Sequence, residues 1–352
     1  MPDLREVPMP HRPTRRAVLT AIAASVGTAV AGCTRPAVRG AAPAASGASG
    51  ASGASGTGGS ATGSPVPRPT PSTTVTTATG PVTVPGGPIR VVVLGTPELD
   101  SAMTLGITPV GATRSALDQG LPDYWPASRL GGIAYVGDTG SPDPERIRAV
   151  EPQVVLGSQA RDGARLAELQ QIAPTVFSRA PGPPWKDNFQ LHAQTLGRQE
   201  QAAAVTAEYR RHTERATKAI RDAGSGGRRI SVLRFVEGPP PGIRTCGRQS
   251  WLGSVLADVG LGRPDAQNTD QDEIDLPLDQ LARADADFLF YATYGDPDRA
   301  GTTAVLRSPA WLALGAVRAH RAFPVEDGLW FQGVGYTGAN LVLGELQRFL
   351  GG

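Results

Sequence analysis

The chain has 352 residues and contains little cysteine or histidine, and each shortage narrows the chemistry it can perform. Its four histidines show none of the short spacings that are typical of zinc or copper sites. No Gly-x-Ser-x-Gly turn and no cysteine–histidine signature of a hydrolase occurs. The sequence therefore disfavours a site for a bare metal ion and a nucleophilic enzyme.

A basic cluster is also missing. The chain carries 34 Lys and Arg against 32 Asp and Glu, and after residue 32 the two classes are equal in number. Proteins that bind nucleic acids need grouped cations, because their affinity depends on the release of phosphate counterions. The composition therefore predicts no nucleic-acid partner and no polybasic patch for a membrane surface.

The N-terminus has the pattern of an export signal that ends at a lipidation site. Arg15 and Arg16 precede an apolar stretch over 21–31, which is too short to span a bilayer, and small residues lead to Cys33. An ordinary buried helix is the alternative, but the position of Cys33 favours the signal. We expect a cleaved twin-arginine signal over 1–32 and a lipoprotein anchored through Cys33 to the extracytoplasmic face of the cell membrane.

The second cysteine, Cys246, has no partner if Cys33 is acylated, so no disulfide within the chain is expected. A reactive thiol is one interpretation of Cys246. A small, partly buried residue without a chemical role is the favoured interpretation.

Residues 33–88 consist of a Gly/Ala/Ser repeat followed by a Pro/Thr tract. Such a segment buries too little apolar surface to offset its ordering entropy, so we predict a disordered tether. A flexible coil of about 50 residues reaches roughly 40 Å from its anchor. Threonine and proline tracts can also carry O-linked sugar, which is a further possibility here.

From residue 89 onward, apolar strands alternate with amphipathic helices, as in parallel α/β folds. The β-branched run in Ile89–Gly95 suits a strand that is buried on both faces. A second alternation starts at Arg229–Phe235. We predict two α/β lobes, over 89–184 and 225–352. The other expected elements are helices over 98–105, 143–150, 163–171, 251–259 and 279–284, and strands over 109–112, 154–156, 175–177 and 288–292.

A connecting helical segment is expected over 185–224. Residues 200–223 contain no Pro or Gly, and their apolar side chains recur at helical spacing, which predicts one helix about 36 Å long. Tyr209 and His212 lie on this stripe and are interpreted as core packing. The predicted fold is thus an α/β fold of two Rossmann-like lobes with central sheets, joined by a rigid interlobe helix, with a ligand cleft between the lobes.

Two motifs suggest other functions. Gly333–Gly338 matches the glycine pattern of a dinucleotide-binding loop, but only 14 residues follow it, too few for a βαβ unit. It is interpreted as close packing at the start of the last helix. The acidic run over 270–275 suggests a calcium loop, but it lacks the turn glycine and Pro277 interrupts it, so a solvated loop is favoured.

Six segments, in order along the chain, resemble one family: Ile89–Gly95, Leu105–Gly111, Val136–Leu156, Gln249–Gly262, Leu278–Phe290 and Ser308–Val325. Together they resemble the iron(III)-siderophore-binding lipoproteins of ABC importers, to which the vitamin B12 receptors are related. The resemblance implies a monomeric receptor that binds a ferric siderophore and delivers it to an ABC permease for iron uptake. It implies no cofactor, since the iron is bound only as a ferric chelate. A cobalamin or haem receptor, an exported enzyme and a structural cell-envelope lipoprotein remain open.

A ferric chelate brings its own metal ligands, so such a receptor needs aromatic faces and guanidinium donors. By resemblance, the ligand contacts map to the loops Ser158–Arg161 and Trp330–Gln332. Four further candidates are added. Arg234 ends an expected strand and Arg244 follows its turn, and the aromatic residues Trp125 and Tyr294 lie near expected strand ends. Each of these side chains could instead belong to the surface or the core. The candidate ligand-binding residues are Ser158, Arg161, Arg234, Trp330, Gln332, Trp125, Arg244 and Tyr294.

The resemblance also implies a docking function for one acidic residue at the start of a helix on each lobe. The matching positions are Glu145 and Asp279, which are expected to meet arginines of the permease. Asp279 is a shorter acid than the family usually has. The alternative is a solvated carboxylate that stabilises the helix dipole.

Overall fold

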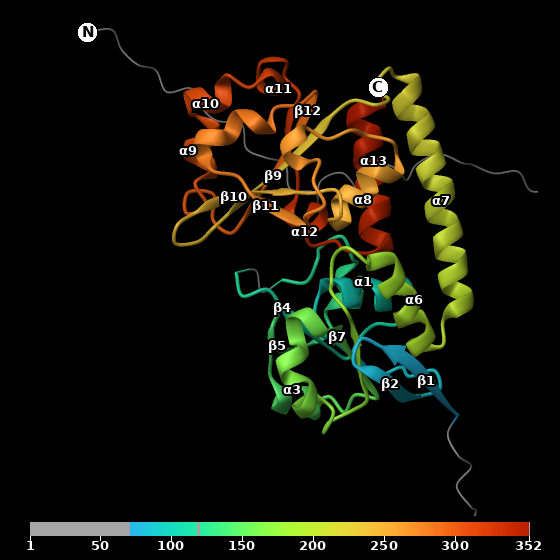
Figure 1. Ribbon diagram of the computed structural model, residues 1–352. Helices are drawn as coiled ribbons and strands as arrows, with labels where there is room; N and C mark the ends of the chain where they lie inside the picture. The colour runs from blue at the N-terminus through green and yellow to red at the C-terminus, as the bar shows by residue number, and fades with distance from the viewer. Residues whose placement is uncertain (1–70, 118–119, 352) are drawn as a thin grey trace, which may run out of the picture. The chain divides into compact units, whose positions relative to one another are not determined.

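The computed structural model describes residues 71–117 and 120–351 (Figure 1). The expected signal residues Arg15 and Arg16, the lipidation residue Cys33 and the tether up to residue 70 lie outside this part of the chain. Within the described part, every helix is too short or too polar to span a lipid bilayer. The described residues form two large sheets and one separate hairpin.

The first lobe is built on a six-stranded sheet with the strand order β6-β5-β4-β3-β7-β8. Its strands pair in parallel except β6, which is antiparallel to β5. The central strand β3 is fully buried, as its run of valines predicts. The strands are β3 (Val91–Val93), β4 (Gly111–Arg114), β5 (Ala134–Asp138), β6 (Ser141–Pro142), β7 (Val154–Ser158) and β8 (Thr175–Ser178).

Short helices follow the strands of this sheet. Asp143 begins one of them, because its carboxylate accepts hydrogen bonds from the backbone N–H groups of Glu145 and Arg146. The single helix expected over 163–171 is divided into a 3-10 turn and a short α-helix. The helices are α1 (Thr96–Thr104), α2 (Ala127–Leu130), α3 (Pro144–Ala149), α4 (Gln159–Asp162), η2 (Gly163–Arg165) and α5 (Leu166–Leu169).

A β-hairpin corrects the predicted tether at its C-terminal end. Residues 71–88 are expected in the tether, but β1 (Ser72–Thr77) and β2 (Gly80–Pro85) pair in antiparallel register there. Val75 and Val84 are buried, and alternating valine and threonine is the pattern of a half-buried strand. Gly80 takes a positive φ of 104° in the turn, which favours glycine.

Two helices connect the lobes: α6 (Trp185–Leu196) and α7 (Gln199–Asp222). The 24 residues of α7 confirm the predicted long helix. Its buried side chains include Tyr209, which packs in the core as expected. Figure 1 shows α7 running alongside the last helix, α13 (Tyr336–Leu350), and past α6.

The second lobe is built on a five-stranded sheet with the order β11-β10-β9-β12-β13. Here β12 pairs in parallel with β9 and β13, whereas β10 is antiparallel to β9 and β11. The helix expected over 279–284 is a 3-10 helix. The strands are β9 (Ile230–Val236), β10 (Gly242–Cys246), β11 (Glu273–Asp275), β12 (Phe288–Tyr294) and β13 (Ala322–Pro324). The helices before α13 are α8 (Trp251–Asp258), η3 (Asp265–Gln267), η4 (Leu278–Ala284), α9 (Thr302–Leu306), α10 (Pro309–Leu312), α11 (Gly315–Arg318) and α12 (Asp327–Trp330).

A carboxylate of the first lobe caps the last helix. Asp100 on α1 is fully buried and accepts hydrogen bonds from the backbone N–H groups of Thr337 and Gly338, at 3.2 and 3.1 Å. A Cβ on Gly335 would lie 2.1 Å from an oxygen of Asp100. Glycine there allows the helix to approach the carboxylate, so this part of the Gly333–Gly338 motif serves close packing.

Aromatic rings surround the same junction. The ring of Tyr336, the first residue of α13, makes edge contacts with Trp185, Phe189 and Tyr209 at centroid distances of 4.8, 4.7 and 5.2 Å. All four side chains are buried. These rings and Asp100 form what we call the interlobe seam. The predicted fold class is confirmed: two α/β lobes with separate central sheets are joined by a long helix.

Candidate functional site

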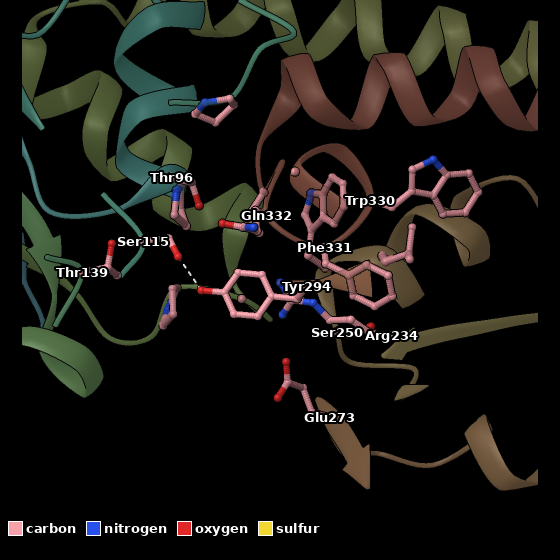
Figure 2. Close-up of a pocket in the computed structure, with 18 of the residues that line it drawn as sticks. Thr96, Ser115, Thr139, Arg234, Ser250, Glu273, Tyr294, Trp330, Phe331 and Gln332 are labelled. Carbon is pink, nitrogen blue, oxygen red and sulfur yellow. Dashed lines mark hydrogen bonds between the residues drawn. The ribbon is translucent and has the colours of Figure 1, made fainter. Parts of the chain in front are cut away.

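A cavity of about 780 Å³ is lined by residues of both lobes, and we call it the cleft. Several of its polar side chains, among them Ser115, Thr139 and Tyr294, lie at or just after the ends of strands, where α/β folds place their ligand sites. Figure 2 shows Thr96, Ser115 and Thr139 of the first lobe on one side, facing Tyr294 and Gln332 of the second lobe. A volume of this size suits a small organic ligand.

Arg234 is held by a carboxylate and two aromatic rings in the second-lobe wall. It lies on β9 and donates to both carboxylate oxygens of Asp327, through Nε at 2.6 Å and Nη2 at 2.7 Å. Its guanidinium also lies 4.5 Å from the ring centre of Tyr294 and 5.2 Å from that of Phe331. Arg234 therefore holds the two rings at the cleft and already has a carboxylate partner.

Arg161 is paired in a similar way on the first lobe. Its Nη2 lies 3.1 Å from a carboxylate oxygen of Glu98 and 2.7 Å from one of Asp162, and both acids are buried. Burial raises the pKa of the Asp162 carboxyl. One cation thus faces two carboxylates at this end of the cleft.

Arg244 lies at the edge of the second sheet and is more exposed than the other two. Its guanidinium nitrogens lie 3.4 Å from carboxylate oxygens of Glu273 and Asp275 on the adjacent strand β11. Asp272 and Glu273 themselves line the cleft. Asp272 has no ion-pair partner within the described part of the chain. The acidic run over 270–275 therefore contributes two carboxylates to the cleft wall.

Trp330 and Gln332 both line the cleft, and each is held from behind. Trp330 is fully buried, stacks on Phe290 at a centroid distance of 4.7 Å and donates from Nε1 to Glu345 at 2.6 Å. The Gln332 amide donates to Asp327 at 2.8 Å. Trp330 thus supports the cleft wall from the core rather than lying open in the cavity.

One hydrogen bond crosses the cleft in Figure 2. It joins the Tyr294 hydroxyl, at the end of β12, to the Ser115 hydroxyl, just after β4. Tyr294 therefore connects the Arg234 side of the cleft to the first lobe.

Six of the eight residues expected to bind a ligand line the cleft, and two do not. Ser158 is buried and begins α4, because its hydroxyl accepts a hydrogen bond from the backbone N–H of Arg161 at 3.4 Å. Trp125 packs against the core, and the Arg129 guanidinium lies 5.2 Å from its ring centre. The six residues that line the cleft are Arg161, Arg234, Arg244, Tyr294, Trp330 and Gln332.

The hydroxyl groups of the first-lobe wall are not predicted from the sequence. Ser115 comes directly after the strand β4, and Thr96 comes shortly after the buried strand β3. Thr113 lies within β4. Polar residues directly after buried parallel strands are the signal that could have found them. Ser250 and Trp251 of the second lobe are also additions from the structure, whereas Phe331 belongs to the expected loop Trp330–Gln332.

The cysteine and two histidines of the described residues, Cys246, His192 and His212, lie in surroundings that suit packing rather than chemistry. Cys246 lines the cleft but is nearly buried, and this burial raises its pKa to about 11, so it is a thiol at neutral pH. Burial lowers the pKa of His192 to about 4. His212 bonds to Asn340 at 2.8 Å between α7 and α13. Within residues 71–117 and 120–351, no group of three His, Cys, Asp or Glu side chains could hold a metal ion.

The comparison with protein families identifies the chain. The model of the family described as "Periplasmic binding protein" matches residues 91–326, which is most of the two lobes. The chain belongs to this family. It is therefore a binding protein and not an enzyme, and the exported enzyme considered from the sequence is set aside.

Curated relatives cover most of the chain. It is 28% identical over 277 residues to the Bacillus subtilis protein named "Probable siderophore-binding lipoprotein YfiY". The matched region covers 76% of this chain and 83% of that protein. It is 27% identical over 275 residues to the achromobactin-binding periplasmic protein of Dickeya dadantii, with 75% and 87% covered.

Solved structures of binding proteins have the same fold as this chain. Staphylococcus aureus SirA in complex with staphyloferrin B matches with a TM-score of 0.70 at 24% identity, over 79% of this chain and 98% of SirA. Bacillus subtilis FeuA in complex with ferri-bacillibactin matches with a TM-score of 0.67 at 19% identity, over 79% and 98%. These likenesses establish the fold of the two lobes.

Proposed function

We propose that the chain is an extracytoplasmic receptor that binds a ferric siderophore in the cleft and delivers it to an ABC permease for iron uptake. The observation that carries this proposal is the 780 Å³ cleft, whose walls combine aromatic rings with arginine and hydroxyl groups. The names of the relatives, which refer to siderophore and achromobactin binding, support the same ligand class.

The proposed ligand contacts are five of the predicted residues that line the cleft, Arg161, Arg234, Arg244, Tyr294 and Gln332, together with the hydroxyl groups of the first-lobe wall. Trp330 supports this wall from the core. Guanidinium and hydroxyl donors suit the oxygens at the periphery of a chelate, and aromatic rings suit its flat faces. The iron enters as cargo inside its chelator, so the protein supplies no metal ligand and no cofactor. In this proposal a monomer suffices, because both walls of the cleft come from one chain.

A panel of ligands tests the proposal. The mature protein is heated with iron-loaded siderophores, the same siderophores without iron, cobalamin and haem. A ligand that binds only the folded state raises the melting temperature, by about 5 °C or more at 100-fold excess over Kd. We expect this rise with at least one iron-loaded siderophore. The proposal would be contradicted if only cobalamin or haem raised the melting temperature. It would also be contradicted if no ligand of the panel raised it.

Permease docking is assigned to Glu145 and Asp279, one on each lobe. Glu145 lies in the first turn of α3 with 83% of its side chain exposed, and Asp279 lies in the first turn of η4, also exposed. Placing arginine at both positions brings like charges against the expected arginines of the permease. We expect iron uptake to fall by about tenfold or more while ligand binding stays unchanged.

A matched control for docking is available on the same two lobes. Glu168→Arg combined with Asp265→Arg makes the same change in charge at exposed positions away from these two helix starts. Uptake should be normal in this variant. If uptake survives the exchange of Glu145 and Asp279, the docking assignment is wrong even where the receptor function holds.

For localisation, we propose export through Arg15 and Arg16 and a lipid anchor on Cys33. Relatives are named lipoproteins or periplasmic proteins, which supports a place outside the cytoplasm. Mass spectrometry of membrane-fraction protein is expected to find a chain that starts at Cys33 with added acyl groups. Cys33→Ala should release the protein from the membrane.

A further inference from the structure

Among the described residues, four arginines and two carboxylates line the cleft, and further carboxylates lie directly behind three of these arginines. These three arginines form ion pairs with carboxylates. Arg161 faces two acids, Arg234 faces one, and Arg244 faces two. The five paired acids are Glu98, Asp162, Asp327, Glu273 and Asp275.

The fourth arginine, Arg114, is also engaged. It donates to the backbone carbonyl of Ile133 at 3.5 Å, and its guanidinium lies 5.7 Å from the ring centre of Tyr135. Asp272 adds a further carboxylate to the cleft wall. A ligand that enters the cleft therefore meets three guanidinium groups that are already paired with carboxylates. In the described part of the chain, the five paired acids and Asp272 make six carboxylates at or directly behind the wall, against four arginines.

The pairs are built so that exchange for a ligand is unfavourable. Arg234 and Asp327 form two parallel hydrogen bonds, and their side chains are only 12% and 9% exposed. If a ligand anion took the place of Asp327, this carboxylate would be left without its cation in a mostly buried position, which is costly. Glu98 and Asp162 are 1% and 0% exposed, so the same holds at Arg161.

The other polar groups of the cleft are neutral. Thr96, Thr113, Ser115, Thr139 and Ser250 offer hydroxyls, and Gln332 offers an amide. Hydroxyl and amide groups suit neutral carbonyl and amide oxygens, whereas a polyanion needs cations that are free to pair with it.

Resting on the proposed function, we propose that the cleft selects ferric chelates without net negative charge, and that Asp272 and Glu273 disfavour anionic chelates. A tris-hydroxamate meets this requirement, because three singly charged hydroxamates balance Fe³⁺. A tris-catecholate chelate carries three negative charges, and ferric citrate chelates are also anionic. Like charges brought together in a partly desolvated cavity repel each other more strongly than they do in water.

The test compares ferrichrome, a neutral tris-hydroxamate, with ferric enterobactin, a tris-catecholate, and with ferric dicitrate. Binding is measured by tryptophan fluorescence quenching on the mature protein. We expect ferrichrome to bind at least about tenfold more tightly than either anionic chelate. Added salt should strengthen the binding of the anionic chelates, because it screens repulsion, whereas free arginines would produce the opposite dependence.

Variants then test the two carboxylates. Asp272→Asn combined with Glu273→Gln should tighten ferric enterobactin binding by about threefold or more and leave ferrichrome binding within about twofold. The control is Asp265→Asn combined with Asp298→Asn, which makes the same change of charge at exposed positions of the same lobe outside the cleft. This control should change neither affinity.

The outcomes separate this inference from the proposed function. An anionic chelate that binds as tightly as ferrichrome, or an unchanged ratio of affinities in the Asp272 and Glu273 variant, would overturn the inference and leave the receptor function standing. If no ferric chelate of any class binds, the proposed function itself fails. Melting temperatures equal to that of the wild type would show that the variants fold.

Discussion

The two lobes meet in two regions that differ in kind, the interlobe seam and the cleft. The seam is buried and closely packed: Tyr336 makes edge contacts with three rings, and Asp100 caps the last helix. The cleft is a cavity with polar walls, and the hydrogen bond drawn across it joins two hydroxyl groups, those of Ser115 and Tyr294. The difference indicates that stability depends on the seam and recognition on the cleft, so substitutions should separate the two.

The largest expected effect comes from the centre of the seam. Tyr336→Ala removes a buried ring that packs on Trp185, Phe189 and Tyr209, and leaves a cavity among them. We expect the free energy of unfolding to fall by about 3–5 kcal/mol, measured by urea denaturation. Ligand affinity of the folded fraction should be unchanged, because Tyr336 does not line the cleft.

Tyr336→Phe is the matched control. It keeps the ring and loses only the hydroxyl, which is hydrogen-bonded to Thr206. The expected cost is about 1 kcal/mol. If the Ala and Phe variants lost equal stability, the ring cluster would not be what holds the seam together.

The second effect is a pH dependence that arises at the seam. Burial raises the pKa of Asp100 to about 6 from its ordinary value of 3.8, although Thr337, Gly338, Thr104 and Tyr124 donate hydrogen bonds to it. The folded state therefore binds a proton more tightly than the unfolded state, and stability falls as pH rises from about 4 to 6. The contribution of this one group is about 3 kcal/mol.

Asp100→Asn isolates this contribution. Between pH 7 and pH 4 the free energy of unfolding of the wild type should rise relative to the variant, by up to about 3 kcal/mol. Asp123→Asn is the control, because Asp123 is a nearby exposed acid and should leave the pH dependence as it is. Parallel pH profiles of wild type and Asp100→Asn would refute the assignment.

The contrast between seam and cleft also explains what the sequence could predict. The strands and the long helix are predictable because apolar runs and helical periodicity are local patterns, as in Val91–Val93 and α7. The sequence does not predict the hairpin β1–β2, because its threonines and valines follow a long low-complexity segment with the composition of a disordered tether. Its burial depends on β8 and α6, which are distant in the sequence.

Side-chain pairing in the cleft was beyond sequence reasoning for a related reason. Arg161 and Arg234 are candidates because arginine suits an oxygen-rich ligand, but their partners Glu98 and Asp327 lie 63 and 93 residues away. Only the fold brings these groups together. The resemblance assigns Ser158 to the ligand contacts, yet in the structure its hydroxyl begins a helix.

The smallest of the three expected effects concerns the cleft alone. Arg234→Ala removes the guanidinium that lies between Asp327 and the rings of Tyr294 and Phe331. Both rings lose their support, and Asp327 is left unpaired beside the ligand. We expect binding of a ferric siderophore to weaken by about tenfold, in a fluorescence-quenching titration. Arg307→Ala, which removes an exposed arginine of the same lobe outside the cleft, should leave affinity unchanged. Equal affinity for the Arg234→Ala variant and the wild type would mean that the cleft does not hold the ligand, and the comparison between seam and cleft would then describe stability alone.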